Sequence, residues 1–178
     1  MRTTSYLLLI LIFSSLLACN TSHHSSDCQE ADWYELGRRD GAMGKELRFE
    51  ESDIPVLCAQ SDVEKQKILF DIGRKAGLID YCKPENAYEL GKDGKSYTNV
   101  CPPETQTKFL EFFRKGHHVR ELQEANQDID KKVSILQEKI RELTPDNQKN
   151  LNTQISTLQN RKARNLRQVE NIEKTIDL

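Results

Sequence analysis

The sequence has no run of 18 or more apolar residues, the length at which a helix becomes a candidate for crossing a bilayer. It also has no excess of bases, because 26 Lys and Arg stand against 28 Asp and Glu and the two kinds are mixed along 178 residues. A nucleic-acid-binding protein normally carries a basic stripe. We therefore expect no membrane-spanning helix in the mature chain and no nucleic-acid partner.

Motifs for catalysis and nucleotide binding are scarce as well. Histidine occurs only as His23-His24 and His117-His118, and both pairs are typical of solvated surface. The chain has no nucleophile-elbow sequence around a serine and no complete G-x-x-x-x-G-K-[ST] phosphate-binding motif. We therefore predict that the chain is not an enzyme and binds no cofactor, metal ion or nucleotide.

Four carboxylates of the first half leave one alternative open. They are Glu35, Asp40, Asp71 and Glu89. A pair of carboxylates is the usual requirement for cleaving a glycosidic bond, although acids beside bases at helical spacing are more typical of a solvated helix face. Binding or cleavage of cell-wall glycan is therefore the alternative function.

The amino terminus has the layout of an export signal. Arg2 precedes an apolar segment over residues 6–17, and a polar run follows over residues 20–26. An apolar core of about a dozen residues is too short to cross the hydrocarbon layer, which takes roughly 20 residues. We predict that residues 1–18 form a signal peptide that is removed.

The end of this signal, Leu16-Leu17-Ala18-Cys19, resembles the lipobox of bacterial lipoproteins. The resemblance implies that Cys19 is lipidated and becomes the first residue of the mature chain. Several acyl chains anchor a protein far more firmly than one. Asn20, where some bacteria use Asp to retain a lipoprotein at the inner membrane, favours the outer membrane facing the periplasm by analogy. Inner-membrane and surface-exposed placements stay open, as does an ordinary signal with a chance cysteine.

The remaining cysteines are Cys28, Cys58, Cys82 and Cys101. An even number in an exported chain predicts two disulfides. Their wide spacing is unlike the close pairs of zinc sites. Three pairings are possible, and the sequential one, Cys28 with Cys58 and Cys82 with Cys101, is the one we favour.

Glycine recurs in similar surroundings across the first half of the mature chain. The similar stretches are Tyr34-Glu35-Leu36-Gly37, Phe70-Asp71-Ile72-Gly73, Tyr88-Glu89-Leu90-Gly91 and, more faintly, Phe112-Phe113-Arg114-Lys115-Gly116. A glycine inside a helix costs about 1 kcal/mol relative to alanine. Repeated glycines on one face therefore indicate that another backbone approaches closely. The glycines expected to share faces are Gly37, Gly41 and Gly44 on one helix and Gly73 and Gly77 on another.

These patterns predict helices near 32–46, 62–78, 85–92 and from 104 onward. Beside the glycine groove we expect five large side chains, namely Trp33, Tyr34, Leu36, Phe70 and Ile72. After Gly116 the chain has no glycine, cysteine or aromatic residue. We place the boundary between the two halves near 114–118, inside a continuous helix.

The second half has a heptad pattern in which apolar residues alternate at steps of three and four. Its first seam is Val119, Leu122, Ile129, Val133, Leu136, Ile140 and Leu143, with Asn126 in the one gap. Its second seam is Leu151, Ile155, Leu158, Lys162, Asn165, Val169, Ile172 and Ile176. Between them, Thr144 is the expected N-cap of a new helix that begins at Pro145.

Folding back at the turn near 144–148 predicts an antiparallel hairpin of two helices. Paired positions then add up to 294 or 295, as for Leu143 with Leu151. This register places Lys162 opposite Val133 and Asn165 opposite Ile129. Polar residues in a seam usually set register or partner number, so a third helix or a partner could dock there.

Several motifs in order connect the first half to a known family. They include Asp32-Trp33-Tyr34-Glu35-Leu36-Gly37, Tyr88-Glu89-Leu90-Gly91 and Val100-Cys101-Pro102. Over about residues 28–120 the chain resembles the small Gram-negative lipoproteins catalogued as domain of unknown function 2799. The resemblance implies no activity and no catalytic residues.

Together these features predict a mainly α fold with four parts. They are the signal peptide (1–18), a lipidated polar tether (19–30), a disulfide-braced helical domain (31–116) and a long antiparallel coiled-coil hairpin (117–178). The expected function is that of a non-enzymatic cell-envelope lipoprotein that presents the hairpin. Its expected partners are the membrane, through the lipid anchor, and an envelope protein or a second copy of itself.

Overall fold

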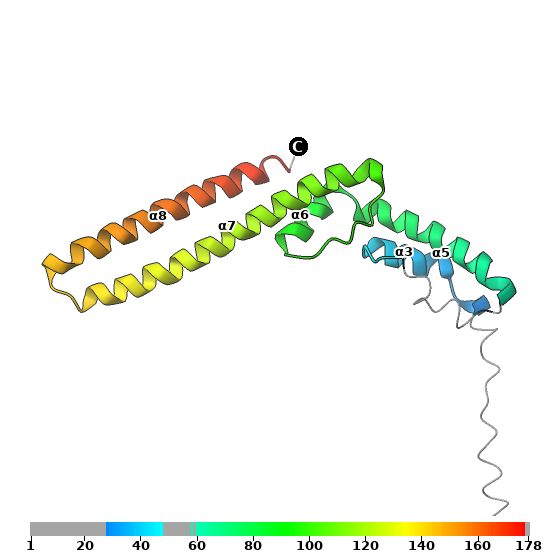
Figure 1. The fold of residues 1–178 in the computed structure, drawn as a ribbon, viewed down its shortest axis with the longest axis horizontal. Helices are drawn as coiled ribbons and strands as arrows, with labels where there is room; N and C mark the ends of the chain where they lie inside the picture. The colour runs from blue at the N-terminus through cyan, green and yellow to red at the C-terminus, as the bar shows by residue number, and fades with distance from the viewer. Residues whose placement is uncertain (1–27, 48–57, 59, 177–178) are drawn as a thin grey trace, which may run out of the picture.

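The computed structural model describes residues 28–47, 58 and 60–176, and within these residues every regular element is a helix (Figure 1). The helices are α3 (Trp33–Ala42), α5 (Gln60–Tyr81), α6 (Pro84–Lys92), α7 (Pro103–Arg141) and α8 (Pro145–Glu173). The predicted mainly α fold is confirmed, and the predicted helix ends agree to about one turn. The signal peptide, Cys19 and the tether as far as residue 27 lie outside the described residues.

Local signals in the sequence explain where the helices begin. At α3, a side-chain oxygen of Asp32 accepts a hydrogen bond from the backbone N–H of Glu35 at 2.9 Å. The helices α6, α7 and α8 each begin with a proline, which has no N–H to leave unsatisfied in the first turn. As predicted, Thr144 is the N-cap of α8.

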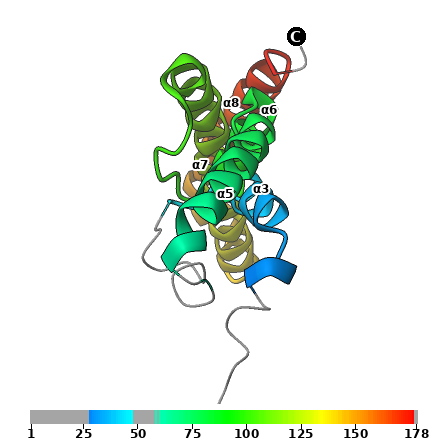
Figure 2. The same cartoon turned by 90° about the vertical axis from the view of Figure 1, so that its right-hand side faces the viewer.

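The first helix pair consists of α3 and α5, which run parallel and meet through their backbones. A Cβ atom on Gly37 would overlap the carbonyl oxygen of Phe70, and one on Gly41 would overlap that of Arg74, one turn further along. The glycines at this contact are Gly37, Gly41, Gly73 and Gly77. The predicted close approach of two backbones is therefore confirmed. In the end-on view of Figure 2, α3 lies directly beside α5.

The second helix pair consists of α6 and the first part of α7, residues 103–118, and it repeats this arrangement. A Cβ atom on Gly91 would overlap the carbonyl oxygen of Phe113, and one on Gly116 would overlap that of Tyr88. These helices also run parallel. Each pair therefore needs a connection that returns the chain to the starting end.

A disulfide joins the starting ends of the two helices in each pair. Cys28 is bonded to Cys58 ahead of α3 and α5, and Cys82 to Cys101 ahead of α6 and α7. This is the pairing favoured from the sequence. The bonds hold together helix ends that a short turn could not connect.

The two pairs are related as longer and shorter copies. From the first cysteine to the last glycine of the contact is 13 residues in the first pair (Cys28 to Gly41) and 9 in the second (Cys82 to Gly91). From the second cysteine the spacings are 19 (to Gly77) and 15 (to Gly116). Both differences are four residues, about one helical turn. In the second pair, the path from each cysteine to the glycine contact is therefore shorter by about one helical turn.

The helices α3 and α6 also end in the same way. Gly44 and Gly94 have positive φ angles of 64° and 69°, and the following Lys45 and Lys95 donate their N–H groups back into the last turn at 3.1 and 2.9 Å. This is the Schellman end of a helix. Gly44 therefore lies beyond α3, and its predicted place on the glycine face of that helix is wrong.

Two apolar clusters flank the glycine contacts. One contains Cys28, Trp33, Cys58 and Phe70, and the other contains Leu78, Tyr81, Cys82, Ala87, Cys101 and Phe109. The predicted packing of Trp33, Leu36 and Phe70 is confirmed. The predicted packing of Ile72 is wrong, because its side chain is exposed. The Tyr34 side chain is exposed as well, although the Tyr34 backbone lies against Gly73 in the contact.

Beyond residue 118, α7 continues without a break and α8 returns antiparallel along it (Figure 1). We call residues 119–176 the hairpin. Its seam buries Val119, Leu122, Ile129 and Ile155, so the predicted heptad seam is confirmed. The carboxyl-terminal end of α8 reaches α6, where Lys92 and Glu173 lie 3.9 Å apart.

The predicted register of the hairpin is wrong by about one turn. Asn165 lies opposite Asn126 rather than Ile129, and its Nδ2 atom donates to Asn126 Oδ1 at 2.9 Å. Both side chains are buried. A buried amide opposite isoleucine would lack a partner at a cost of about 1–3 kcal/mol, and the observed register removes that cost.

Candidate functional site

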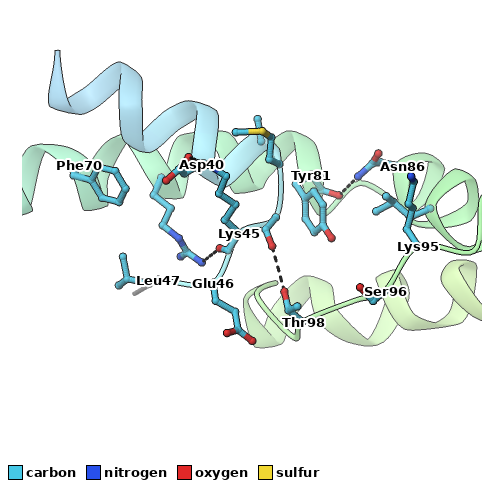
Figure 3. Close-up of a pocket in the computed structure, with 15 residues that line it drawn as sticks. Asp40, Lys45, Glu46, Leu47, Phe70, Tyr81, Asn86, Lys95, Ser96 and Thr98 are labelled. Atoms are coloured by element: carbon cyan, nitrogen blue, oxygen red, sulfur yellow. Dashed lines mark hydrogen bonds and ion pairs between the residues drawn. The ribbon is translucent and has the colours of Figure 1, made fainter. Parts of the chain in front are cut away.

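A cavity of about 780 Å³ lies where the two helix pairs meet (Figure 3). Its walls are α5, the segment after α3 and the segment after α6. Three hydrogen bonds hold these walls: Arg74 Nη2 to the Lys45 carbonyl at 2.8 Å, Thr98 Oγ1 to the Gly44 carbonyl at 3.2 Å, and Asn86 Nδ2 to the Tyr81 carbonyl at 2.6 Å. Hydrogen bonds between its walls therefore define this cavity at the junction of the two helix pairs.

The charges that line this cavity are mixed. Asp40 forms an ion pair with Lys45 at 2.6 Å. Arg74 Nε is buried and has no hydrogen-bond partner among the described residues, and Lys95 also lines the cavity. The cavity could therefore accept an acceptor-rich or anionic group. Arg74 was not predicted as a site residue, because nothing in its local sequence distinguishes it from other surface bases.

The segment Gly94-Lys95-Ser96 matches the last three positions of a phosphate-binding loop. In such loops the motif precedes a helix, so that backbone N–H groups at the helix start face the phosphate. Here Gly94 instead ends α6. The segment therefore lacks the backbone arrangement of that site.

Three of the four carboxylates considered for glycan cleavage are held in separate surface ion pairs. Glu35 pairs with Arg38 and Asp71 with Lys75, each at 2.6 Å. The hydrogen bond from Arg38 lowers the pKa of Glu35. Of the four candidates only Asp40 lines the cavity, so they do not form a common site.

No cluster of three or more potential metal ligands occurs in the part of the chain that the structure describes. His117 and His118 are exposed, and each lies within 3.4 Å of Glu121. Cys28, Cys58, Cys82 and Cys101 are bonded in pairs. His23, His24 and Cys19 are outside the described residues.

The hairpin carries a second candidate surface, a groove of about 470 Å³ between α7 and α8. Ile135, Leu136 and Leu158 supply its apolar walls. Thr153 and Thr157 also line it, and their hydroxyls donate back to the carbonyls of Lys149 and Thr153 at 3.0 and 2.9 Å. Because those hydroxyls are satisfied within the helix, the groove offers mainly apolar surface.

Basic side chains continue from this groove along α8. Residues 147–169 contain five bases and no acid. Lys162, predicted opposite Val133, instead reaches Asp130 on α7 at 2.6 Å. Arg161, Arg164 and Arg167 are exposed, and none has an ion-pair partner within the described ranges. The hairpin therefore presents an apolar groove followed by free positive charge.

Comparison with known proteins finds a family match for the first half of the chain. Residues 32–118 match the sequence profile of a family described as a protein of unknown function, DUF2799. Residues 32–118 belong to this family. The DUF2799 region spans both helix pairs and ends at His118, one residue before the hairpin seam begins at Val119. The hairpin lies outside the match.

No curated protein and no solved structure matches the chain. Within the described residues, none of the helices combines the length and apolarity needed to cross a membrane. The DUF2799 region carries no activity that can be assigned from its family. Its function must therefore be argued from the surfaces described above.

Proposed function

We propose that this chain is a lipid-anchored, non-enzymatic protein of the bacterial envelope that presents its hairpin to a protein partner. The observation that carries the proposal is the separation of the molecule into a compact DUF2799 region and a projecting hairpin with its own surface. The hairpin's turn, between α7 and α8, lies at the opposite end of the molecule from α3 and α5 (Figure 1).

The anchor part of the proposal rests on the lipobox-like sequence that ends at Cys19. The two disulfides agree with an exported chain, since disulfides persist in oxidising compartments. An outer-membrane position facing the periplasm follows by analogy from Asn20. The anchor is tested by growing cells with labelled palmitate. We expect label in the wild-type protein and none after Cys19→Ser.

The partner part rests on the groove beside Ile135 and on Arg161, Arg164 and Arg167. An apolar groove flanked by unpaired bases suits a helix that carries aliphatic and acidic residues. An envelope protein or the hairpin of a second copy could supply such a helix.

A photo-crosslinking amino acid at Ile135 tests the partner. We expect an adduct of defined mass in intact cells, and none from the same amino acid at exposed Thr107 on the same helix. An adduct of twice the chain mass identifies a second copy. Failure of Ile135 to crosslink, together with a purified chain that stays monomeric, would remove the proposed role of the hairpin.

The cavity between the helix pairs supports one alternative, binding or cleavage of cell-wall glycan. Buried Arg74 Nε could donate to a sugar hydroxyl or a carboxylate. Sedimentation with purified cell wall tests this directly. Retention that is lost on Arg74→Met, or turnover that is lost on Asp40→Asn, would favour the alternative.

A further inference from the structure

The outer face of α5 carries large aliphatic side chains that no described element covers. Ile68, Ile72 and Ile79 are 52, 51 and 70% exposed. At about 100° per residue they fall within roughly 40° of one another, and Leu69 flanks them at 37% exposure. We call these four residues the α5 stripe. Aliphatic side chains so exposed and so aligned usually mark an interaction surface.

The α5 stripe lies opposite α3, the described helix that packs along α5. Gly73 and Gly77, which contact α3, are about 140° and 180° around the helix from Ile68. Figure 1 shows α3 along one side of α5 and no helix along the other. Among the described helices, α3 packs along the opposite face of α5 and leaves the stripe uncovered.

The length of the tether indicates what the stripe can reach. Eight residues lie between Cys19 and Cys28, and the nine Cα–Cα steps across them span at most roughly 30 Å. Cys28 is bonded to Cys58, two residues before α5 begins. From the start of α5 to Ile79 is about 28 Å of helix. An acyl anchor at Cys19 therefore keeps the whole stripe within reach of the bilayer.

The hairpin is not within the same reach. Ile135 is as exposed as the stripe, at 55%, but it lies about 48 Å along α7 from Pro103. The α5 stripe is therefore the apolar surface near the anchor, and Ile135 on the hairpin belongs to an apolar surface far from it.

The charges around the stripe also fit a bilayer surface. Lys65 and Lys75 flank it most closely on the helix, where their stems can lie along the apolar surface while their ammonium groups reach headgroups. Glu64 and Asp71 lie at its border, and Asp71 is paired with Lys75 at 2.6 Å. The face is therefore apolar, with the two bases nearest to it and the two acids further out.

We infer that the α5 stripe seats the DUF2799 region flat on the membrane beside its own lipid anchor. This inference rests on the proposed anchor at Cys19. The acyl chains supply the affinity, because they keep the bilayer at a high local concentration around α5. The stripe then sets the orientation of the region on the bilayer. The occupant is the lipid surface, and a second copy of the chain is the competing outcome.

The first test uses the mature chain exported with Cys19→Ser, which carries no acyl chain. We expect it to co-sediment with vesicles of phosphatidylethanolamine and phosphatidylglycerol at millimolar lipid. The substitutions Ile68→Ser, Ile72→Ser and Ile79→Ser together should lower the partition coefficient at least tenfold. Leu166→Ser, on the hairpin at a matched exposure of 52%, should leave it unchanged.

The second test uses the acylated wild-type chain in the same vesicles. Hydroxyl-radical oxidation of Ile72 and Ile79 should fall several-fold relative to the unacylated chain in buffer, while Ile135 should be oxidised equally in both. Equal oxidation of the stripe in both states would overturn the inference. So would protection of the stripe in buffer with a dimer in solution, which would assign it to a second copy. Neither outcome affects palmitate labelling at Cys19.

Discussion

The two parts of α7 pack by different means. Before residue 118 the helix meets α6 through Gly116, with no side chain between the backbones. After it, the helix meets α8 through interlocking side chains, beginning with fully buried Val119. A single continuous helix therefore serves both a backbone contact and a side-chain seam.

The glycine contact and the hairpin seam differ in how well they tolerate substitutions and in whether a disulfide supports them. The glycine contact leaves no room for even one methyl group, and the Cys82–Cys101 disulfide holds the helix starts beside it. The hairpin has no disulfide and sets its register through a buried amide pair, Asn126 with Asn165. We therefore expect the helix pairs to be rigid and intolerant of substitution, and the hairpin to accept changes that preserve its seam.

The largest expected effect comes from filling a glycine contact. Gly116→Leu should lower the free energy of unfolding by about 4 kcal/mol or more, because the side chain would force α6 and α7 apart. Val119→Ala, one turn away in the seam, should cost only about 2 kcal/mol as a cavity. Urea denaturation followed by circular dichroism measures both.

The matched control is Gln123→Leu, which adds the same side chain at an exposed position of α7. It should change the free energy of unfolding by less than about 0.5 kcal/mol. If Gly116→Leu were no more destabilising than this control, the close backbone contact would carry no stability.

Removing one disulfide should have the next largest effect. Cys82→Ala with Cys101→Ala should cost about 3 kcal/mol, since the closed loop of 19 residues is no longer constrained. Amide exchange should accelerate in α6 and the start of α7 but not in α8. The corresponding change at Cys28 and Cys58 should loosen the first helix pair instead. Faster exchange across the hairpin in either variant would show that the two regions are not independent.

Helix positions could be predicted because their signals are local. Pro84, Pro103 and Pro145 mark three helix starts, and the recurring glycines indicated a backbone contact before its partners were known. These local signals do not say which helices pack together or whether they run parallel or antiparallel. The parallel packing of each helix pair was therefore not predicted.

The hairpin register shows where a sequence pattern becomes ambiguous. A seam that repeats every three or four residues still aligns after a shift of one turn, so apolar positions alone allow more than one register. The pairing of Asn126 with Asn165 decides between them. Arg74 was not predicted as a site residue, because its contacts come from segments that are distant in the sequence, such as the one with Lys45.

A smaller effect should come from breaking the amide pair. Asn126→Leu alone should cost about 2 kcal/mol, since Asn165 stays buried without a partner. The double change Asn126→Leu with Asn165→Leu should recover most of that loss and permit more than one register. Denaturation of the two single variants and the double variant gives the coupling energy. Additive losses would mean that the two amides do not interact.

Alkaline pH should have the smallest effect, and it should fall on the helix pairs alone. Burial raises the pKa of Tyr81, with the charge of Tyr97 adding to the shift. Because the folded state favours the neutral phenol, this contribution to stability is complete below about pH 10, where an unfolded tyrosine ionises. It is lost as the pH rises above that value.

The hairpin from residue 119 onward has no aromatic residue, so α8 should keep its exchange protection while α5 and α6 loosen. Tyr81→Phe should abolish the step without loss at neutral pH. Simultaneous loss of protection in α8 would contradict the division of the molecule at residue 118.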